Sequence, residues 1–260
     1  AVMGDIHGDW RLANARYDQY VAEHGKPDLL IQVGDYGYFP KDPPSRDRFK
    51  TEEDYQFALY HTIVSRSIWD RDFGHPCWFI DGNHDHHEKL RELIDGDKPV
   101  IIKGKNCSWE YMPRGTYRDG FLFVGGASSV DKEIRLGGGM YWSELENLTR
   151  SEVDDILEAD HEDVKVVISH TCPASFDMRY ACSPVWGGEN KEELNRVYLD
   201  EIMKKYKPDH WIFGHWHSSG RNLPKDNLEL EWRCLAICEI MKLEEHIDIG
   251  NQRGMDTETA

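Results

Sequence analysis

The stretch that decides the fold reads Leu29-Leu30-Ile31-Gln32-Val33-Gly34-Asp35. A short, mostly apolar run is followed at once by a glycine and a carboxylate, a pattern typical of a buried strand that ends in a turn. In an α/β sheet, side chains at the carboxyl ends of the strands line the functional site. The stretch therefore predicts a strand over Leu29–Val33 that delivers Asp35 to such a site.

Four further blocks carry ligand-type side chains, mostly where an apolar run meets a glycine or a turn. They read Asp5-Ile6-His7, Gly82-Asn83-His84-Asp85, Ser169-His170 and Gly214-His215-Trp216-His217. Carboxylate, imidazole and amide groups suit divalent cations such as Mn, Fe, Ni or Zn. In the first and last blocks two candidate ligands are two residues apart, so in an extended segment both would leave the same face. The set is too large for one metal and predicts two metals that share a bridging ligand.

The order, spacing and flanking glycines of these five blocks resemble the calcineurin-like metallophosphoesterase superfamily. Its pattern is D-x-H, G-D, G-N-H-D/E, an isolated H after a strand, and G-H-x-H. In this chain the blocks occur in that order and extend from Asp5 to His217. The resemblance implies a four-layer α/β/β/α sandwich with two packed mixed β-sheets. Strands that alternate with helices, followed by a run of short strands, favour an α/β fold on their own.

The resemblance also implies which residues bind the metals. Asp35 would bridge two divalent ions, with manganese expected and Fe, Ni, Zn or Mg as alternatives. The first ion would be held by Asp5, His7 and His217, and the second by Asn83, His170 and His215. The neutral amide of Asn83 limits the summed negative charge of such a site.

A site of this kind implies a metal-dependent phosphoesterase that hydrolyses phosphate mono- or diesters. Two metals that share a water lower its pKa, so that a bridging hydroxide can attack phosphorus, and they neutralise charge on the phosphoryl oxygens. No protein nucleophile is required. By the resemblance, His84 lies near the leaving group and acts as general acid.

One departure separates this chain from the protein serine/threonine phosphatase branch, where the second block continues as G-D-x-x-D-R-G. Here it reads Gly34-Asp35-Tyr36-Gly37-Tyr38-Phe39-Pro40, without the second Asp and the Arg. In that branch the Asp orients the general-acid histidine and the Arg contributes to phosphate binding. The orienting partner of His84 is thus left open, with Asp85 as a candidate. The segment, together with Gly125-Gly126-Ala127-Ser128, looks more like small metallophosphoesterases of bacteria and their phages.

Composition bounds the rest of the interpretation. A net charge of −17 disfavours a passive duplex-binding surface and favours a small molecule or nucleotide as the phosphate ester. Because the blocks must converge on one site, we expect one catalytic domain over residues 1–248 and a polar tail over 249–260. No signal peptide or membrane-length apolar run is visible, and most of the six cysteines are interpreted as core residues of a reduced compartment, the cytoplasm. A Cys172–Cys182 disulfide is the alternative.

The patterns predict both helices and strands. Helices are expected over Asp9–His24, Arg46–Asp72, His86–Ile94, Ser143–Ala159 and Asn190–Tyr206. Ser143 and Glu146 are spaced as a capping box, and residues 128–141 are expected to form a loop. Further strands are expected over Ala1–Asp5, Cys77–Ile80, Val164–Ser169 and His210–Phe213, and one or two closing strands over Leu228–Ile240. Four short strands are interpreted as the beginning of a second sheet: Val100–Ile102, Ser108–Met112, Thr116–Arg118 and Phe121–Gly125.

Several alternatives stay open. The chain could be a nuclease or a nucleic-acid end-processing phosphatase, which would require a basic track, or a non-catalytic scaffold on the same fold. Asp131, Lys132 and Arg135 form either a substrate-contacting loop or a solvated one. His86 could face the substrate, and Trp186-Gly187-Gly188 could line one wall of the pocket.

Overall fold

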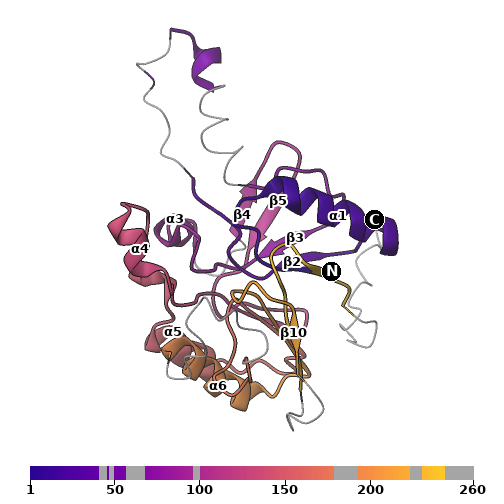
Figure 1. Cartoon of the computed structure of the whole chain (residues 1–260), viewed down its shortest axis with the longest axis vertical. Helices are drawn as coiled ribbons and strands as arrows, with labels where there is room; N and C mark the ends of the chain where they lie inside the picture. Colours follow the sequence, from indigo (N-terminus) through magenta and orange to yellow (C-terminus); the bar gives the residue numbers. More distant parts are fainter. Residues whose placement is uncertain are drawn as a thin grey trace, which may run out of the picture.

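Two six-stranded sheets form the centre of the molecule, and helices flank them (Figure 1). The computed structural model describes residues 1–40, 46, 50–56, 68–95, 100–178, 193–222 and 230–243. The expected α/β fold with two mixed sheets is confirmed. Trp186 to Gly188, Cys182 and the tail over 249–260 lie outside the described residues.

The first sheet has four parallel strands between two antiparallel edge strands. In order across the sheet they are β12 (Ile240–Met241), β1 (Val2–Met3), β2 (Leu30–Gln32), β3 (Cys77–Phe79), β5 (Ser108–Tyr111) and β4 (Val100–Lys103). β1, β2 and β3 are buried along their whole length, as parallel strands covered on both faces are. The sheet brings together strands from the two ends of the described chain.

The second sheet is built in the same way, with antiparallel strands at both edges. Its order is β10 (Gly220–Arg221), β11 (Glu231–Cys234), β9 (His210–Phe213), β8 (Val166–Ser169), β7 (Phe121–Val124) and β6 (Tyr117–Arg118). The expectation that the residues of β4 and β5 begin this sheet is wrong, because β5 pairs in parallel with β3 of the first sheet. The second sheet begins at β6.

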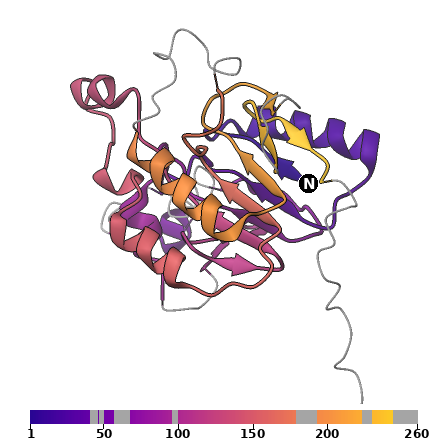
Figure 2. The ribbon, with the colours of Figure 1, turned by 90° about the horizontal axis from the view of Figure 1, so that it is seen from below.

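Successive side chains along a strand point to opposite faces of its sheet, and this alternation builds the four layers. In β7, Phe121 and Phe123 pack against Val2 and Ile31 of the first sheet, so the two sheets lie face to face. Leu122 points the other way, into a cluster with residues of α5 (Arg150–Glu158) and α6 (Leu194–Tyr206). A third cluster joins the outer face of the first sheet to α1 (Trp10–His24). Figure 2 shows α1 on one side of the strands and α5 and α6 on the other.

Two predicted helices and one predicted loop need correction. Residues 52–56 are helical, but the stretch from Ile68 to Asp72 is not, because Ile68 and Trp69 turn into the core beside α1. The residues between, 57–67, lie outside the described part. The expected loop over 128–141 contains a short helix, α4 (Lys132–Gly137).

The third correction concerns the expected helix over Ser143–Ala159, which is two elements. A 3-10 turn, η2 (Glu144–Glu146), precedes α5. The capping box is formed by Thr149 and Glu152 rather than by Ser143 and Glu146. Glu146 is instead buried, and it accepts a hydrogen bond from the Ser129 hydroxyl.

The described residues bear on the expected absence of a membrane span and on the state of the cysteines. None of their helices combines the length and apolar character that crossing a bilayer requires. Cys77, Cys107 and Cys238 carry free thiols. The Cys172–Cys182 alternative falls partly outside the described residues.

Candidate metal centre

The predicted ligands all follow parallel strands at their carboxyl ends. Asp5 and His7 follow β1, Asp35 follows β2 and Asn83 follows β3 in the first sheet. In the second sheet His170 follows β8, and the last block follows β9. Because the carboxyl ends of parallel strands meet at one edge of each sheet, and the sheets pack face to face, the five blocks converge.

The first group consists of Asp5, His7, Asp35 and His217, each with one ligand atom within 4.8 Å of the others. The Nε2 atoms of His7 and His217 face each other at 2.9 Å. His217 Nε2 lies 3.3 Å from Asp5 Oδ2, and His7 Nε2 lies 3.6 Å from Asp35 Oδ2. Two imidazole nitrogens and two carboxylates form a donor set that fits a borderline divalent cation.

The second group gathers around the amide oxygen of Asn83. Its Oδ1 lies 3.0 Å from His170 Nε2 and 2.9 Å from His215 Nδ1. His170 Nε2 also lies 3.2 Å from Asp35 Oδ1. The two oxygens of Asp35 thus face different groups, which is the arrangement that a bridging ligand needs. The seven predicted residues come together in the two expected sets; that metal ions occupy them stays a prediction.

The backbone that carries these ligands is strained. His7, Asp35, His215 and His217 have φ values of 51°, 52°, 69° and 52°, in the left-handed region that residues other than glycine rarely adopt. The expectation that the paired ligands leave one face of an extended segment is therefore wrong. Turns aim them at the site instead, and such strain is typical of functional positions.

Hydrogen bonds from the surrounding backbone orient the ligands. His170 Nδ1 contacts the Val33 carbonyl oxygen at 2.8 Å, which leaves Nε2 for the site. The His215 N–H donates to both carboxylate oxygens of Asp5, at 3.1 and 3.0 Å. The His84 N–H donates to Asp35 Oδ1 at 2.6 Å.

The glycines of the blocks are explained by close approach. A Cβ on Gly214 would lie 2.0 Å from Asp5 Oδ1, and one on Gly82 would lie 2.2 Å from Asp35 Oδ1. Any side chain at either position would displace a carboxylate of the site.

The buried pair of Asp35 and His170 holds a proton in the metal-free protein. Burial opposes ionisation of Asp35, but the His170 imidazole outweighs it and holds the pKa of the carboxyl well below its usual range. Burial likewise opposes the charged imidazole, but Asp35 raises the pKa of His170 to about 10. For His215, burial and then the charge of His170 keep the pKa well below its usual value. A divalent cation that binds here would displace the proton of His170.

Asp85 does not occupy the place expected of a partner for His84. It is fully buried, and its two oxygens accept the backbone N–H groups of Tyr36, Gly37, Tyr38 and Gly82. It therefore ties the segment after Asp35 to the third block. The carboxylate that faces the His84 ring is Asp131, whose Oδ2 lies 3.7 Å from Nε2. Burial lowers the pKa of His84.

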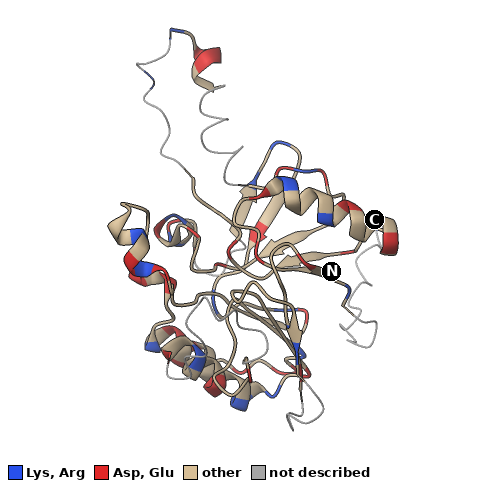
Figure 3. Cartoon of the chain, in the orientation of Figure 1, with Lys and Arg blue, Asp and Glu red and all other residues tan. Residues whose placement is uncertain are grey.

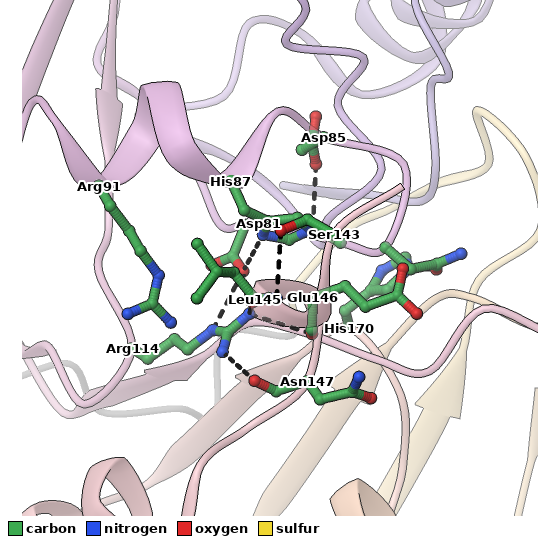
Figure 4. Close-up of polar contacts among 12 residues, drawn as sticks. Asp81, Asp85, His87, Arg91, Arg114, Ser143, Leu145, Glu146, Asn147 and His170 are labelled. Atoms are coloured by element: carbon green, nitrogen blue, oxygen red, sulfur yellow. Dashed lines mark hydrogen bonds and ion pairs between the residues drawn. The ribbon is translucent and has the colours of Figure 1, made fainter. Parts of the chain in front are cut away.

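A buried arginine that the sequence analysis missed clamps the end of β3. Arg114 Nη2 donates to Asp81 Oδ2 at 2.7 Å and to the Leu145 carbonyl oxygen at 2.9 Å, and Nη1 donates to the Asn147 carbonyl oxygen at 2.8 Å. Figure 4 shows the guanidinium between Asp81 and the segment from Leu145 to Asn147. Asp81 precedes Asn83 by two residues, so the clamp holds a predicted ligand against the turn η2. No motif surrounds Arg114, and the only local signal was a carboxylate directly after the third strand.

Comparison with known protein families identifies one family for this chain. Residues 1–219 match one family model, described as calcineurin-like phosphoesterase. A search of curated protein sequences found no significant match.

Similar solved structures include a dimetal phosphatase from Danio rerio, with 14% identity and a TM-score of 0.43 over 88% of this chain and 78% of that one. An anchor in the inner membrane complex of Plasmodium has 12% identity and a TM-score of 0.41, over 90% and 70%. A phosphopantetheinyl hydrolase from Mycobacterium tuberculosis has 12% identity and a TM-score of 0.38, over 91% and 89%. All three likenesses are distant.

Proposed function

The chain belongs to the calcineurin-like phosphoesterase family, and from that membership we propose that it is a hydrolase of phosphate mono- or diesters that uses two divalent metal ions. One observation carries the proposal. The Asp35 carboxylate directs Oδ2 toward His7 of one ligand group and Oδ1 toward His170 of the other.

The residues present fit a pair of divalent ions. Asp5, His7 and His217 would hold one, and Asn83, His170 and His215 the other, with Asp35 between them. When bound, the ions would supply an activated water and neutralise charge on the phosphoryl oxygens. The nitrogen and oxygen donors suit Mn²⁺, and they also suit Fe, Ni or Zn.

We assign the general acid to His84. Its side chain is 31% exposed, whereas His170 is fully buried, so His84 is accessible to a bound ester. Its ring centroid lies 5.1 Å from that of His7, at the first ligand group. Because Asp131 faces Nε2, Nδ1 is the ring nitrogen that remains to protonate the leaving oxygen.

The charge distribution supports a small-molecule or nucleotide ester over duplex nucleic acid. The net charge is −17, and Figure 3 shows acidic and basic residues interspersed along the outer helices α1, α5 and α6. A duplex-binding surface normally gathers basic residues. The missing second Asp and Arg after Asp35 support a place outside the protein serine/threonine phosphatase branch.

We further propose a single catalytic domain over residues 1–248. The pairing of β12 with β1 supports it, because the sheet requires strands from both ends of the described chain.

The free thiols of Cys77, Cys107 and Cys238 are consistent with a reducing compartment, and we propose the cytoplasm.

The first experiment measures hydrolysis of 4-nitrophenyl phosphate and bis(4-nitrophenyl) phosphate by metal-stripped protein, before and after Mn²⁺ is added back. We expect turnover only with Mn²⁺, and the ratio of the two rates to distinguish phosphatase from phosphodiesterase. His84→Ala should lower kcat by roughly 10²-fold or more while metal binding is kept, because general acid catalysis contributes on that order. Asp35→Ala should lose metal binding.

Two outcomes would contradict the proposal. Absence of metal binding by the wild-type protein would remove its basis. Binding of two ions without turnover of either ester or of a panel of nucleotides would favour the non-catalytic scaffold.

A further inference from the structure

The orientation of the Asn83 amide decides whether this residue can be a metal ligand. An amide has an acceptor end and a donor end of nearly the same shape, and only the oxygen can bind a cation. In the structure Oδ1 faces His170 Nε2 and His215 Nδ1, at 3.0 and 2.9 Å. The other end, Nδ2, donates to the Ser129 hydroxyl oxygen at 3.1 Å.

The Ser129 hydroxyl is arranged so that it can only accept from Asn83. A hydroxyl has one proton to donate and two lone pairs. Its proton goes to Glu146 Oε2 at 2.6 Å, and its second lone pair accepts from Arg135 Nη1 at 2.7 Å. A flipped Asn83 amide would set its oxygen against an oxygen that has no free proton, and would turn its N–H groups toward the ligand nitrogens.

The groups that hold Ser129 are themselves buried and anchored. Glu146, on η2, is 2% exposed and also accepts the Ser129 N–H at 2.7 Å. Arg135, on α4, is 3% exposed and also donates to the carbonyl oxygens of Asn83 and Tyr141, at 3.3 and 2.9 Å. Burying a carboxylate and a guanidinium is costly unless both are hydrogen-bonded, so this hub is unlike the chance contacts of a solvated loop.

We propose that Ser129 is a positioning residue that keeps the Asn83 oxygen directed at the second ligand group and so sets the affinity of that group for its metal ion. The inference rests on the two-metal site of the proposed function. Outer hydrogen-bonding partners of metal ligands typically contribute 10- to 100-fold in affinity.

The neighbouring serine provides a matched control. Ser128 Oγ lies instead 2.6 Å from Asn147 Oδ1 and 2.8 Å from Glu193 Oε1, so that its one proton goes to one of these oxygens, and it accepts from Asn195 Nδ2 at 3.0 Å. Ser128→Ala removes the same group from the same loop and leaves the contact with Asn83 intact.

The test is a calorimetric titration of Mn²⁺ into metal-free protein, with electron paramagnetic resonance to detect the coupled pair of ions. Ser129→Ala should weaken one of the two binding steps by roughly 10- to 100-fold and leave the other unchanged. Ser128→Ala should leave both steps unchanged, and Ser129→Thr, which keeps the hydroxyl, should restore the weakened step. Wild-type affinity in Ser129→Ala, or an equal loss in Ser128→Ala, would overturn the inference.

A second test distinguishes the loss of amide orientation from a general perturbation of the loop by Ser129→Ala. It repeats the substitution in a protein that carries Asn83→Asp. Asn83→Asp presents an oxygen in either orientation, so adding Ser129→Ala there should cost much less than it does in the wild-type background. An equal cost in both backgrounds would contradict the role in orientation. These readouts need no turnover: two bound ions without hydrolysis would count against the proposed function, whereas an unaffected Ser129→Ala counts only against this inference.

Discussion

Asp131 begins α4 without capping it. Aspartate at a helix N-cap normally accepts a backbone N–H from the first turn, which stabilises the helix by about 1 kcal/mol. Here its side chain makes no such bond. Oδ2 faces His84 Nε2 at 3.7 Å, Oδ1 lies 3.8 Å from Arg135 Nη1, and within the described residues the buried Oδ1 has no hydrogen-bond partner. The Asp131 side chain therefore does not stabilise the start of α4 and lies instead beside the candidate general acid.

This arrangement predicts a dependence on the leaving group. Asp131→Asn should lower kcat for phenyl phosphate by roughly 10- to 100-fold, because a poor leaving group needs the proton that His84 supplies, but should change kcat for 2,4-dinitrophenyl phosphate little. Rates are measured with saturating Mn²⁺. Glu133→Gln, an exposed carboxylate on the same helix, is the control and should behave as wild type. Equal losses on both esters would indicate a structural role only.

At the scale of elements, the Arg114 clamp joins β3 to the segment before α5. Its ion pair with Asp81 is almost fully buried, with the side chains 5% and 2% exposed. Burial opposes ionisation of Asp81, but Arg114 reverses the effect and holds the pKa of the carboxyl far below its usual range. Such a group stabilises the fold above its unfolded pKa of about 4, and that contribution is lost as pH falls toward the folded value.

We therefore expect Arg114→Ala to lower the free energy of unfolding by about 3–5 kcal/mol at neutral pH, because the buried Asp81 carboxylate loses its arginine partner. Among the described residues it keeps only the Tyr111 hydroxyl at 2.9 Å and the His87 ring at 3.5 Å. The deficit should shrink as pH falls and Asp81 becomes protonated. Denaturant unfolding of the metal-free protein at several pH values measures both effects. Arg91→Ala is the comparison: Arg91 pairs with Glu152 at 2.8 Å but is 38% exposed, so its loss should cost under about 1 kcal/mol. A similar cost for both variants would refute the clamp.

At the scale of the whole molecule, the candidate ligands join the two sheets. Asp5, Asp35 and Asn83 come from the first sheet, and His170, His215 and His217 come from the second. Metal ions bound between them would act as a cross-link that exists only in the folded state.

Metal addition should therefore stabilise the fold. At a free Mn²⁺ concentration 100 times the Kd, we expect each bound ion to add about 2.7 kcal/mol to the free energy of unfolding, seen as a rise in Tm that chelation reverses. Asp35→Ala should abolish most of the rise, because it removes a ligand common to both groups. An unchanged Tm in the wild-type protein, at a concentration where calorimetry detects binding, would contradict a site that spans both sheets.

The sequence by itself predicted the set of candidate ligands and determined the class of fold. Each ligand-type side chain follows a short apolar run, and strand ends, turns and residue types are local properties that a sequence displays directly. Local patterns were less reliable where one side chain had two possible partners. Glu146 fits a capping box with Ser143, but Thr149 and Glu152 form the box, and Glu146 is buried against Ser129.

Only the tertiary structure decided what surrounds the candidate ligands. Ser129 lies 46 residues from Asn83, and Arg114 lies 33 residues from Asp81. Asp131, rather than the adjacent Asp85, faces His84. These contacts follow from how the loops after β3, β5 and β7 meet at the edge of two packed sheets. No periodicity or spacing encodes such a meeting, because it depends on the packing of the whole molecule.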